Sequence, residues 1–274
     1  MAHLRLSTVV VTALAALALG SAATGAAPQP LEFGWPTGLD VQRDGSLLVV
    51  DSTSRVLIRV DPATGKETTL ATFGKPWGVA AGLPGVAYVS NSQLLERVAG
   101  GKTSPVAAAP GSWEIGPVVV AANGDVLYAT PAAVYRLVGG KGTPVRILSL
   151  RGGSAPHGMT IARGGSILLA DPDHGVVLRI DPATGRSETF AKLGSPRGID
   201  VAPDGSVYVA SGTEKRIVHL SAAGKRLGTV GPRFGDPYAL AVDAHGVVWA
   251  IDTAEIGYVR RIVPGGASSF LTAR

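Results

Sequence analysis

The sequence contains no cysteine among its 274 residues. This absence excludes disulfides, cysteine-linked lipid anchors and metal sites built on thiolates. Charged residues make up only 16% of the chain, and the formal net charge of +5 is spread over scattered basic pairs. Because nucleic-acid binding needs a concentrated basic stripe, we expect no nucleic acid among the partners.

Long apolar runs are also missing. The one extended apolar stretch covers residues 6–19, follows Arg5 and precedes a series of small residues over 20–27. A membrane-spanning helix needs about 20 apolar residues, so this stretch is too short to span. A charged start, a short apolar core and small residues are typical of a secretory signal peptide. We predict a signal peptide over residues 1–26, a secreted or periplasmic location, and no membrane span after its removal.

Glycine and proline are abundant, with 37 and 19 residues, and they mark a repeat. The stretch 196–211 combines an apolar strand, an Asp-Gly turn and a second apolar strand, which is a strong hairpin signal. Equivalent turn glycines recur every 39 to 41 residues, at Gly45, Gly85, Gly124, Gly165, Gly205 and Gly246. This period is typical of four-stranded propeller blades.

Each unit has room for four strands. In the first unit we expect strands at Leu39–Val41, Leu47–Val50, Val56–Val60 and Lys66–Leu70. The sequence therefore predicts an all-β, six-bladed β-propeller of four-stranded antiparallel blades over residues 31–274. The predicted blades are 35–74, 75–113, 114–154, 155–194, 195–235 and 236–274.

The two ends of the chain compete for one place in this ring. Either the segment 31–33 or the segment 268–271 supplies an outer strand of the last blade, and the sequence leaves both open. In either case the ring closes without a covalent link and leaves only short edges.

The repeat resembles a known family. Pro-x-Gly, an apolar strand, Asp-Gly, a strand ending in Asp and an Arg-containing third strand are similar to the NHL repeat. Wider relatives are the SMP-30/gluconolactonase-like and streptogramin B lyase-like propellers. The resemblance covers all six units and implies the fold, but such folds support unrelated activities.

The resemblance also allows a comparison of sites. Streptogramin B lyase-like propellers use histidines at the Pro-His-Gly position of more than one blade, and here only His157 matches. SMP-30-like lactonases place Glu, Asn and Asp at this inner position around a metal. That set is missing from the other five blades of this chain, so the lactonase metal site looks absent.

Strand geometry brings two sets of side chains to one face of the ring. The first follows the leading proline of each inner strand: Thr37, Trp77, Gly116, His157, Arg197 and Tyr238. The second ends each second strand: Asp51, Asn91, Thr130, Asp171, Ser211 and Asp252. The second set is a ring of oxygen ligands for a hard cation, or it caps backbone amides; we favour capping because a polar residue recurs in every blade.

The fourth unit carries the densest group of chemical side chains. His157, Asp171 and His174 form the candidate metal site, which would hold a divalent cation as cofactor. His157 as a base and Arg197 as a group stabilising negative charge are the candidate catalytic residues. The alternative is that both histidines lie at the surface without a ligand.

Aromatic residues suggest a second kind of site. We predict that Trp77, His157, Arg197 and Tyr238 bind a small molecule, a glycan or a peptide at the channel mouth. The alternative is packing between blades, which we expect for Trp35 and Trp113, with Trp249 in the core.

Three functional hypotheses follow for what we expect to be a monomer. The first is a ligand- or protein-binding module that uses the channel mouth. The second is a metal-dependent lyase or hydrolase, and the third is a scaffold that uses its outer surface. The sequence leaves open whether the protein is an enzyme.

Overall fold

A computed structural model describes residues 29–152, 154–254 and 256–272. The predicted signal peptide lies outside these residues and stays a prediction. Within the described part of the chain, no helix has the length and apolar character needed to cross a membrane.

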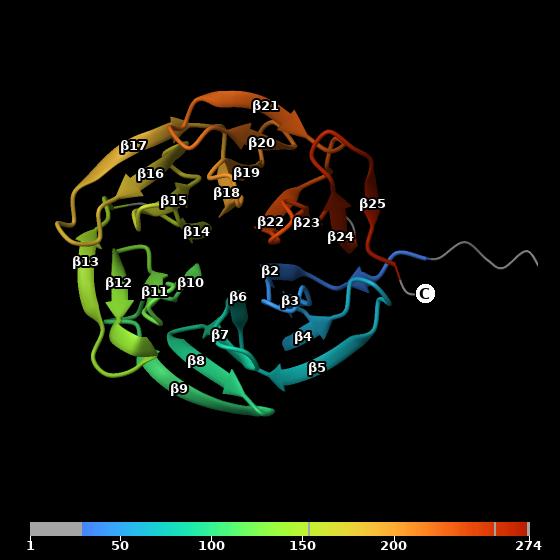
Figure 1. Cartoon of the computed structure of the whole chain (residues 1–274). Helices are drawn as coiled ribbons and strands as arrows, with labels where there is room; N and C mark the ends of the chain where they lie inside the picture. The colour runs from blue at the N-terminus through green and yellow to red at the C-terminus, as the bar shows by residue number, and fades with distance from the viewer. Residues whose placement is uncertain (1–28, 153, 255, 273–274) are drawn as a thin grey trace, which may run out of the picture.

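The chain forms a ring of six small antiparallel sheets around a central opening (Figure 1). The predicted six-bladed propeller is therefore confirmed. Blades 1 to 3 contain β2 (Pro36–Val41), β3 (Leu47–Asp51), β4 (Val56–Val60), β5 (Glu67–Thr72), β6 (Pro76–Ala81), β7 (Val86–Asn91), β8 (Leu94–Ala99), β9 (Lys102–Ala108), β10 (Val118–Val120), β11 (Val126–Ala129), β12 (Ala133–Leu137) and β13 (Val145–Ser149), with the short 3-10 helix η1 (Val138–Gly140) in blade 3.

Blades 4 to 6 follow the same plan. They contain β14 (Gly158–Ile161), β15 (Ile167–Asp171), β16 (Val176–Ile180), β17 (Ser187–Lys192), β18 (Pro196–Val201), β19 (Val207–Ser211), β20 (Arg216–Leu220), β21 (Arg226–Val230), β22 (Pro237–Val242), β23 (Val248–Asp252), β24 (Gly257–Ile262) and β25 (Ser268–Phe270). The inner strands β2, β6, β10, β14, β18 and β22 surround the opening in Figure 1.

The turns explain why strands start and stop where they do. Gly45 adopts a φ of 83°, which a residue with a side chain rarely adopts, and its amide donates to the carbonyl of Gln42 at 2.9 Å. At the outer hairpin of the same blade, the Asp61 carboxylate accepts the Ala63 amide at 2.8 Å and Gly65 has a φ of 71°. These local hydrogen bonds fix the hairpins and thereby the strand register.

Apolar side chains hold neighbouring blades together. In the described part of the chain, a cluster of buried hydrophobic residues fills each of the six gaps between adjacent blades. The glycine of the Pro-x-Gly motif serves the same contact, since a Cβ on Gly38 would lie 2.9 Å from the Trp77 carbonyl oxygen of the next blade. The motif thus lets inner strands approach closely around the channel.

Both ends of the chain close the ring on one strand. Residues of β1 (Glu32–Phe33) pair with Gly257 and Tyr258 of β24, whereas β25 pairs with the segment 260–262 of the same strand. The Leu31 amide also donates to the Leu271 carbonyl at 2.8 Å. The two predicted alternatives for closure are therefore both present, on different halves of β24.

Blade 3 departs from the others at its inner strand. The Gly116 amide donates to the Ala129 carbonyl at 2.8 Å, as the His157 amide does to Ala170 in blade 4 at 3.1 Å. Gly116 is therefore the counterpart of His157, and Ile115 takes the place of the leading proline. Because Gly116 has no side chain, this blade contributes no bulk to the face where His157 lies.

Candidate functional site at the channel mouth

Three aromatic rings meet where the inner strands begin. The ring centroids of Trp77 and His157 are 5.7 Å apart, those of Trp77 and Tyr238 5.8 Å, and those of His157 and Tyr238 5.4 Å. The residues come from blades 2, 4 and 6, so only closure of the ring brings them together. These edge-to-face and tilted contacts are geometries that stabilise aromatic groups.

Arg197 of blade 5 completes this group. Its guanidinium lies 5.3 Å from the Tyr238 ring centroid and donates to the Asp236 carboxylate at 2.7 Å. The side chain is 22% exposed, so the charge is paired with Asp236 and still reaches the surface. The structure thus brings together the four residues predicted to bind a ligand, which we call the mouth: Trp77, His157, Arg197 and Tyr238.

A cavity of about 190 Å³ lies beside the mouth, above blade 3. Trp77, His157 and Gly116 form part of its wall. The ion pair between Lys75 and Glu114, at 2.6 Å, also lines it. The cavity therefore combines flat aromatic surface with a charged, hydrogen-bonding edge.

His157 contacts both of the other aromatic rings of the mouth. Burial lowers the pKa of His157, and the positive charge of Arg197 lowers it further, although Asp173 and Asp236 act in the opposite direction. The neutral imidazole is thus favoured near pH 7. In the described structure the buried Nδ1 atom has no hydrogen-bond partner. Since buried polar atoms are normally satisfied, a water or a ligand atom is the expected partner.

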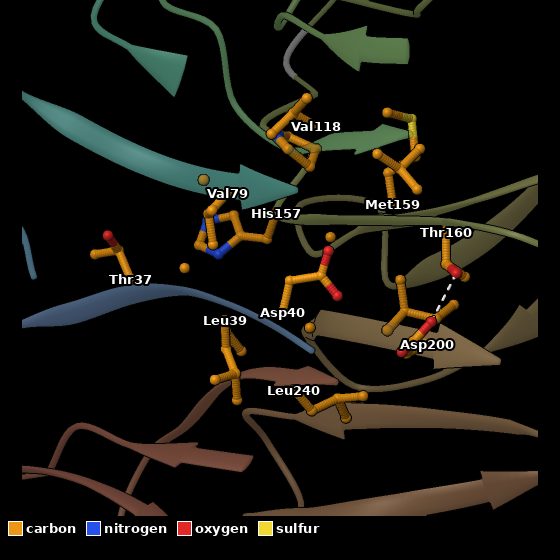
Figure 2. Close-up of a pocket in the computed structure, with 18 of the residues that line it drawn as sticks. Thr37, Leu39, Asp40, Val79, Val118, His157, Met159, Thr160, Asp200 and Leu240 are labelled. Carbon is orange, nitrogen blue, oxygen red and sulfur yellow. Dashed lines mark hydrogen bonds between the residues drawn. The ribbon is translucent and has the colours of Figure 1, made fainter. Parts of the chain in front are cut away.

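Two carboxyl groups that the sequence motifs did not indicate lie deeper in the channel. Figure 2 shows Asp40, Asp200 and the His157 ring among the inner strands. These residues line a cavity with a volume of about 80 Å³. Asp40 accepts the Ala81 amide of blade 2 at 2.7 Å, and Asp200 accepts the Val242 amide of blade 6 at 2.8 Å. The sequence signal that could have identified both carboxyl groups is an aspartate at the fifth position of a strand that begins with Pro-x-Gly.

The channel perturbs both carboxyl groups. Although Asp40 retains some exposure to the narrow channel, burial raises its pKa to about 7, with a further contribution from the charge of Asp200. Burial also raises the pKa of Asp200, while hydrogen bonds from Val242, Val201 and Thr160 oppose the shift. Figure 2 marks the Thr160–Asp200 hydrogen bond, which measures 2.8 Å. Through their hydrogen bonds, Asp40 and Asp200 each link their own inner strand to the inner strand of the next blade.

The polar residues that end the second strands cap backbone amides, as we favoured from the sequence. Asp51 accepts the amides of Gly34 at 2.9 Å, Trp35 at 3.1 Å and Thr53 at 2.9 Å. The other blades repeat this with their own acceptors: Asn91 with Lys75, Thr130 with Ala133, Asp171 with His174, Ser211 with Glu214 and Asp252 with Asp236. The recurring polar character therefore has a structural explanation.

The three candidate metal ligands fall into two places. His174 Nδ1 lies 2.8 Å from the Asp171 carboxylate in a cavity between blades 3 and 4, whereas His157 lines the mouth and the channel. Among the residues that the structure describes, no group of three or more His, Cys, Asp or Glu is arranged to hold a metal ion. The structure thus joins Asp171 with His174 and leaves His157 with the aromatic rings.

The tryptophans outside the mouth differ from expectation in part. Trp249 is 4% exposed, which confirms its place in the core. Trp35 and Trp113 are 43% and 49% exposed, so the expected packing between blades is wrong for both. Both residues precede the inner strand of their blade and lie at the surface. Trp35 still contacts Tyr238, with ring centroids 6.3 Å apart.

Comparisons with known proteins support the fold. No family model and no curated sequence matches the chain. Among solved structures, a streptogramin B lyase superposes with a TM-score of 0.69 at 16% identity, covering 90% of this chain and 86% of that one. A gluconolactonase from Xanthomonas campestris gives 0.74 at 15% identity, covering 85% and 88%. A calcium-binding regucalcin from Agrobacterium tumefaciens gives 0.67 at 14% identity, covering 82% and 85%.

These likenesses confirm the fold that the repeat motif indicated. Identities of 14–16% carry no activity from one chain to another. The chain is a six-bladed β-propeller whose structural neighbours are streptogramin B lyase, gluconolactonases and regucalcin-like proteins.

Proposed function

We propose that this protein is an exported ligand-binding propeller that holds a small molecule at the mouth of its channel. The observation that carries the proposal is that His157 lines the cavity and that its buried Nδ1 atom has no hydrogen-bond partner in the described structure. A rigid ring supplies this site before the ligand arrives, so little conformational entropy is lost on binding.

The lining of the cavity indicates the kind of ligand. Trp77 offers a flat apolar surface, while Ser92 and the Lys75–Glu114 ion pair offer donors and acceptors at the edge. A pyranose ring has one flat apolar face and a rim of hydroxyl groups, which matches this distribution. We therefore favour a sugar, free or at the end of a glycan, over a purely apolar ligand.

Metal-dependent lyase or hydrolase chemistry has less support than binding. Its three proposed ligands are divided between two cavities, and Arg197 is already paired with Asp236 at 2.7 Å. A binding site needs neither a metal nor a general base, and the mouth has the shape and polarity for it. Export is part of the proposal because of the signal-peptide pattern over residues 1–26.

Saturation-transfer NMR with a panel of monosaccharides tests the proposal. We expect saturable binding that weakens about tenfold in Trp77→Ala, since a lost stacking surface costs about 1.4 kcal/mol. Trp113→Ala is the matched control, because Trp113 is an exposed tryptophan that does not line the cavity. No binding across the panel, or equal losses in both variants, would contradict the proposal.

A further inference from the structure

Another cavity lies between blades 3 and 4, away from the mouth. Its volume is about 340 Å³, within the range of small-molecule sites. We call it the crevice and define it by its lining: Leu148, Ser149, Leu150, Arg151, Ser154, Asp171, His174, Val176, Leu178, Ser187, Glu188 and Thr189. It shares none of these residues with the mouth, so its chemistry is independent of the function proposed above.

The crevice contains a histidine held in one orientation by a buried carboxylate. Asp171 is 3% exposed, and one of its oxygens lies 2.8 Å from His174 Nδ1 and 2.8 Å from the Ser154 hydroxyl oxygen. In a neutral imidazole, donation from Nδ1 to the carboxylate leaves Nε2 as an acceptor. No other group in the described residues bonds to Nε2, so it is available to a ligand hydroxyl.

Equivalent positions in other blades show that this atom is unusual. Ser54 of blade 1 uses its hydroxyl to bond Asp51 at 3.0 Å, and Glu214 of blade 5 uses its carboxylate to bind Arg226. The polar groups of both side chains therefore form their hydrogen bonds within their own blade. His174 makes the same local cap with one nitrogen and retains a second nitrogen in the wall of the crevice.

The charges of the crevice point to an anionic ligand group. Asp171 is engaged with Ser154 and His174, and Glu188 lies 3.8 Å from the Arg179 guanidinium. Arg151 is exposed, and in the described part of the chain its side chain has no ion pair or hydrogen bond. Its guanidinium therefore offers a fork of donors that matches a carboxylate.

Apolar residues form the rest of the wall. Leu148 and Leu150 come from the outer edge of blade 3, and Val176 and Leu178 come from β16 of blade 4. They present hydrocarbon on both sides of the gap. A ligand that fills the crevice consequently needs an aliphatic part in addition to its polar groups.

We propose that the crevice binds an aliphatic hydroxycarboxylate. The carboxylate pairs with Arg151, the hydroxyl donates to Nε2 of His174, and the hydrocarbon chain lies between the leucines of blade 3 and the apolar residues of β16. The carboxylate, the hydroxyl and the hydrocarbon chain each make one of these contacts, so a ligand that lacks one of the three groups binds less tightly.

Isothermal titration calorimetry of the whole protein with 3-hydroxyoctanoate at pH 8 tests this assignment. Octanoate lacks the hydroxyl and 1,3-octanediol lacks the carboxylate, so each removes one interaction. We expect 1:1 binding of 3-hydroxyoctanoate and about tenfold weaker binding of both analogues, equal to about 1.4 kcal/mol for each lost group. No binding of 3-hydroxyoctanoate, or equal affinity for octanoate, would overturn the proposal.

Variants assign the two contacts. Arg151→Gln is expected to weaken 3-hydroxyoctanoate about tenfold and leave 1,3-octanediol unchanged. His174→Ala is expected to remove the preference for 3-hydroxyoctanoate over octanoate. Trp77→Ala, in the mouth, serves as the control and should leave both affinities unchanged; a loss there would place the ligand in the mouth instead. Circular dichroism verifies that each variant is folded.

Discussion

Asp40 and Asp200 hold the ring in the same way from different blades. Each carboxylate accepts the amide of the following residue and an inner-strand amide of the next blade, at distances of 2.7–2.8 Å. The two groups are not electrostatically independent, because the charge of Asp200 raises the pKa of Asp40. The channel wall is therefore a place where protonation and stability are linked.

Replacing Asp40 with Asn should change how stability depends on pH. The folded-state pKa of about 7 lies above the ordinary value of 3.8, so the folded protein binds more protons than the unfolded chain between these values. Asp40 thus favours the fold most at low pH, and this contribution is lost as the pH rises through 7. We expect the stability of Asp40→Asn, relative to the wild type, to improve steadily from pH 4 to pH 8.

Thermal unfolding monitored by circular dichroism across this range measures the effect. Asp61→Asn is the control, because Asp61 lies in an exposed turn and hydrogen bonding from Ala63 lowers its pKa. Parallel melting-temperature profiles for Asp40→Asn and the wild type would show that Asp40 is not linked to stability in this window.

The capping aspartates should contribute strongly to stability. Asp51 is 2% exposed and accepts amides from two loops as well as the Ser54 hydroxyl at 3.0 Å. Asp51→Ala leaves several of these donors without a partner, and we expect a loss of about 3 kcal/mol in the free energy of unfolding. Urea denaturation measures it, with Asp61→Ala as an exposed turn control; similar small losses in both would contradict the capping role.

The titration of His157 should report the charges around the mouth. Burial and the charge of Arg197 lower the pKa of His157, so Arg197→Gln should move that pKa upward. The paired carboxylate of Asp236 remains in this variant and acts in the same direction. Imidazole resonances followed by NMR measure the shift. Arg179→Gln, in blade 4 beside Phe190, is the control and should leave the His157 titration unchanged.

Closure of the ring should depend on Phe33. Its side chain is 3% exposed and packs in the cluster between blades 6 and 1, which includes Trp249 and Val259. Phe33→Ala should cost about 3 kcal/mol in the free energy of unfolding because it leaves a cavity in that cluster. Leu227→Ala, at a position that is 55% exposed, should cost almost nothing. Equal melting temperatures for the two variants would exclude a closing role for β1.

The repeat made the fold predictable from the sequence. The turn glycines indicated the period of the repeat, and the apolar runs indicated the strands. Because six units share this pattern, the same architecture was indicated six times. Positions equivalent by repeat could be assigned to one face, which correctly grouped Trp77, His157, Arg197 and Tyr238 in space. A repeat thus predicts which residues converge even when they are far apart in sequence.

The repeat did not predict the direction in which a side chain in a loop points. His174 follows Asp171 by three residues, and its ring turns toward blade 3, whereas Asp173 influences the pKa of His157. Sequence spacing does not specify to which side a loop residue points. Asp40 and Asp200 were overlooked for another reason: a charged residue within an apolar strand has meaning only once the neighbouring inner strand is known.

Because β1 and β25 both pair with β24, proteolytic cleavage near this strand would open the ring. The sheets of blades 1 to 5 are each built from a continuous stretch of chain, but blade 6 needs β1 from the beginning and β25 from the end. If a protease cut the chain between β23 and β24 and the C-terminal piece dissociated, Phe33 would lose the strand with which it pairs. A clipped chain would therefore expose β1 as an unpaired strand edge, whereas the intact chain keeps that edge paired with β24.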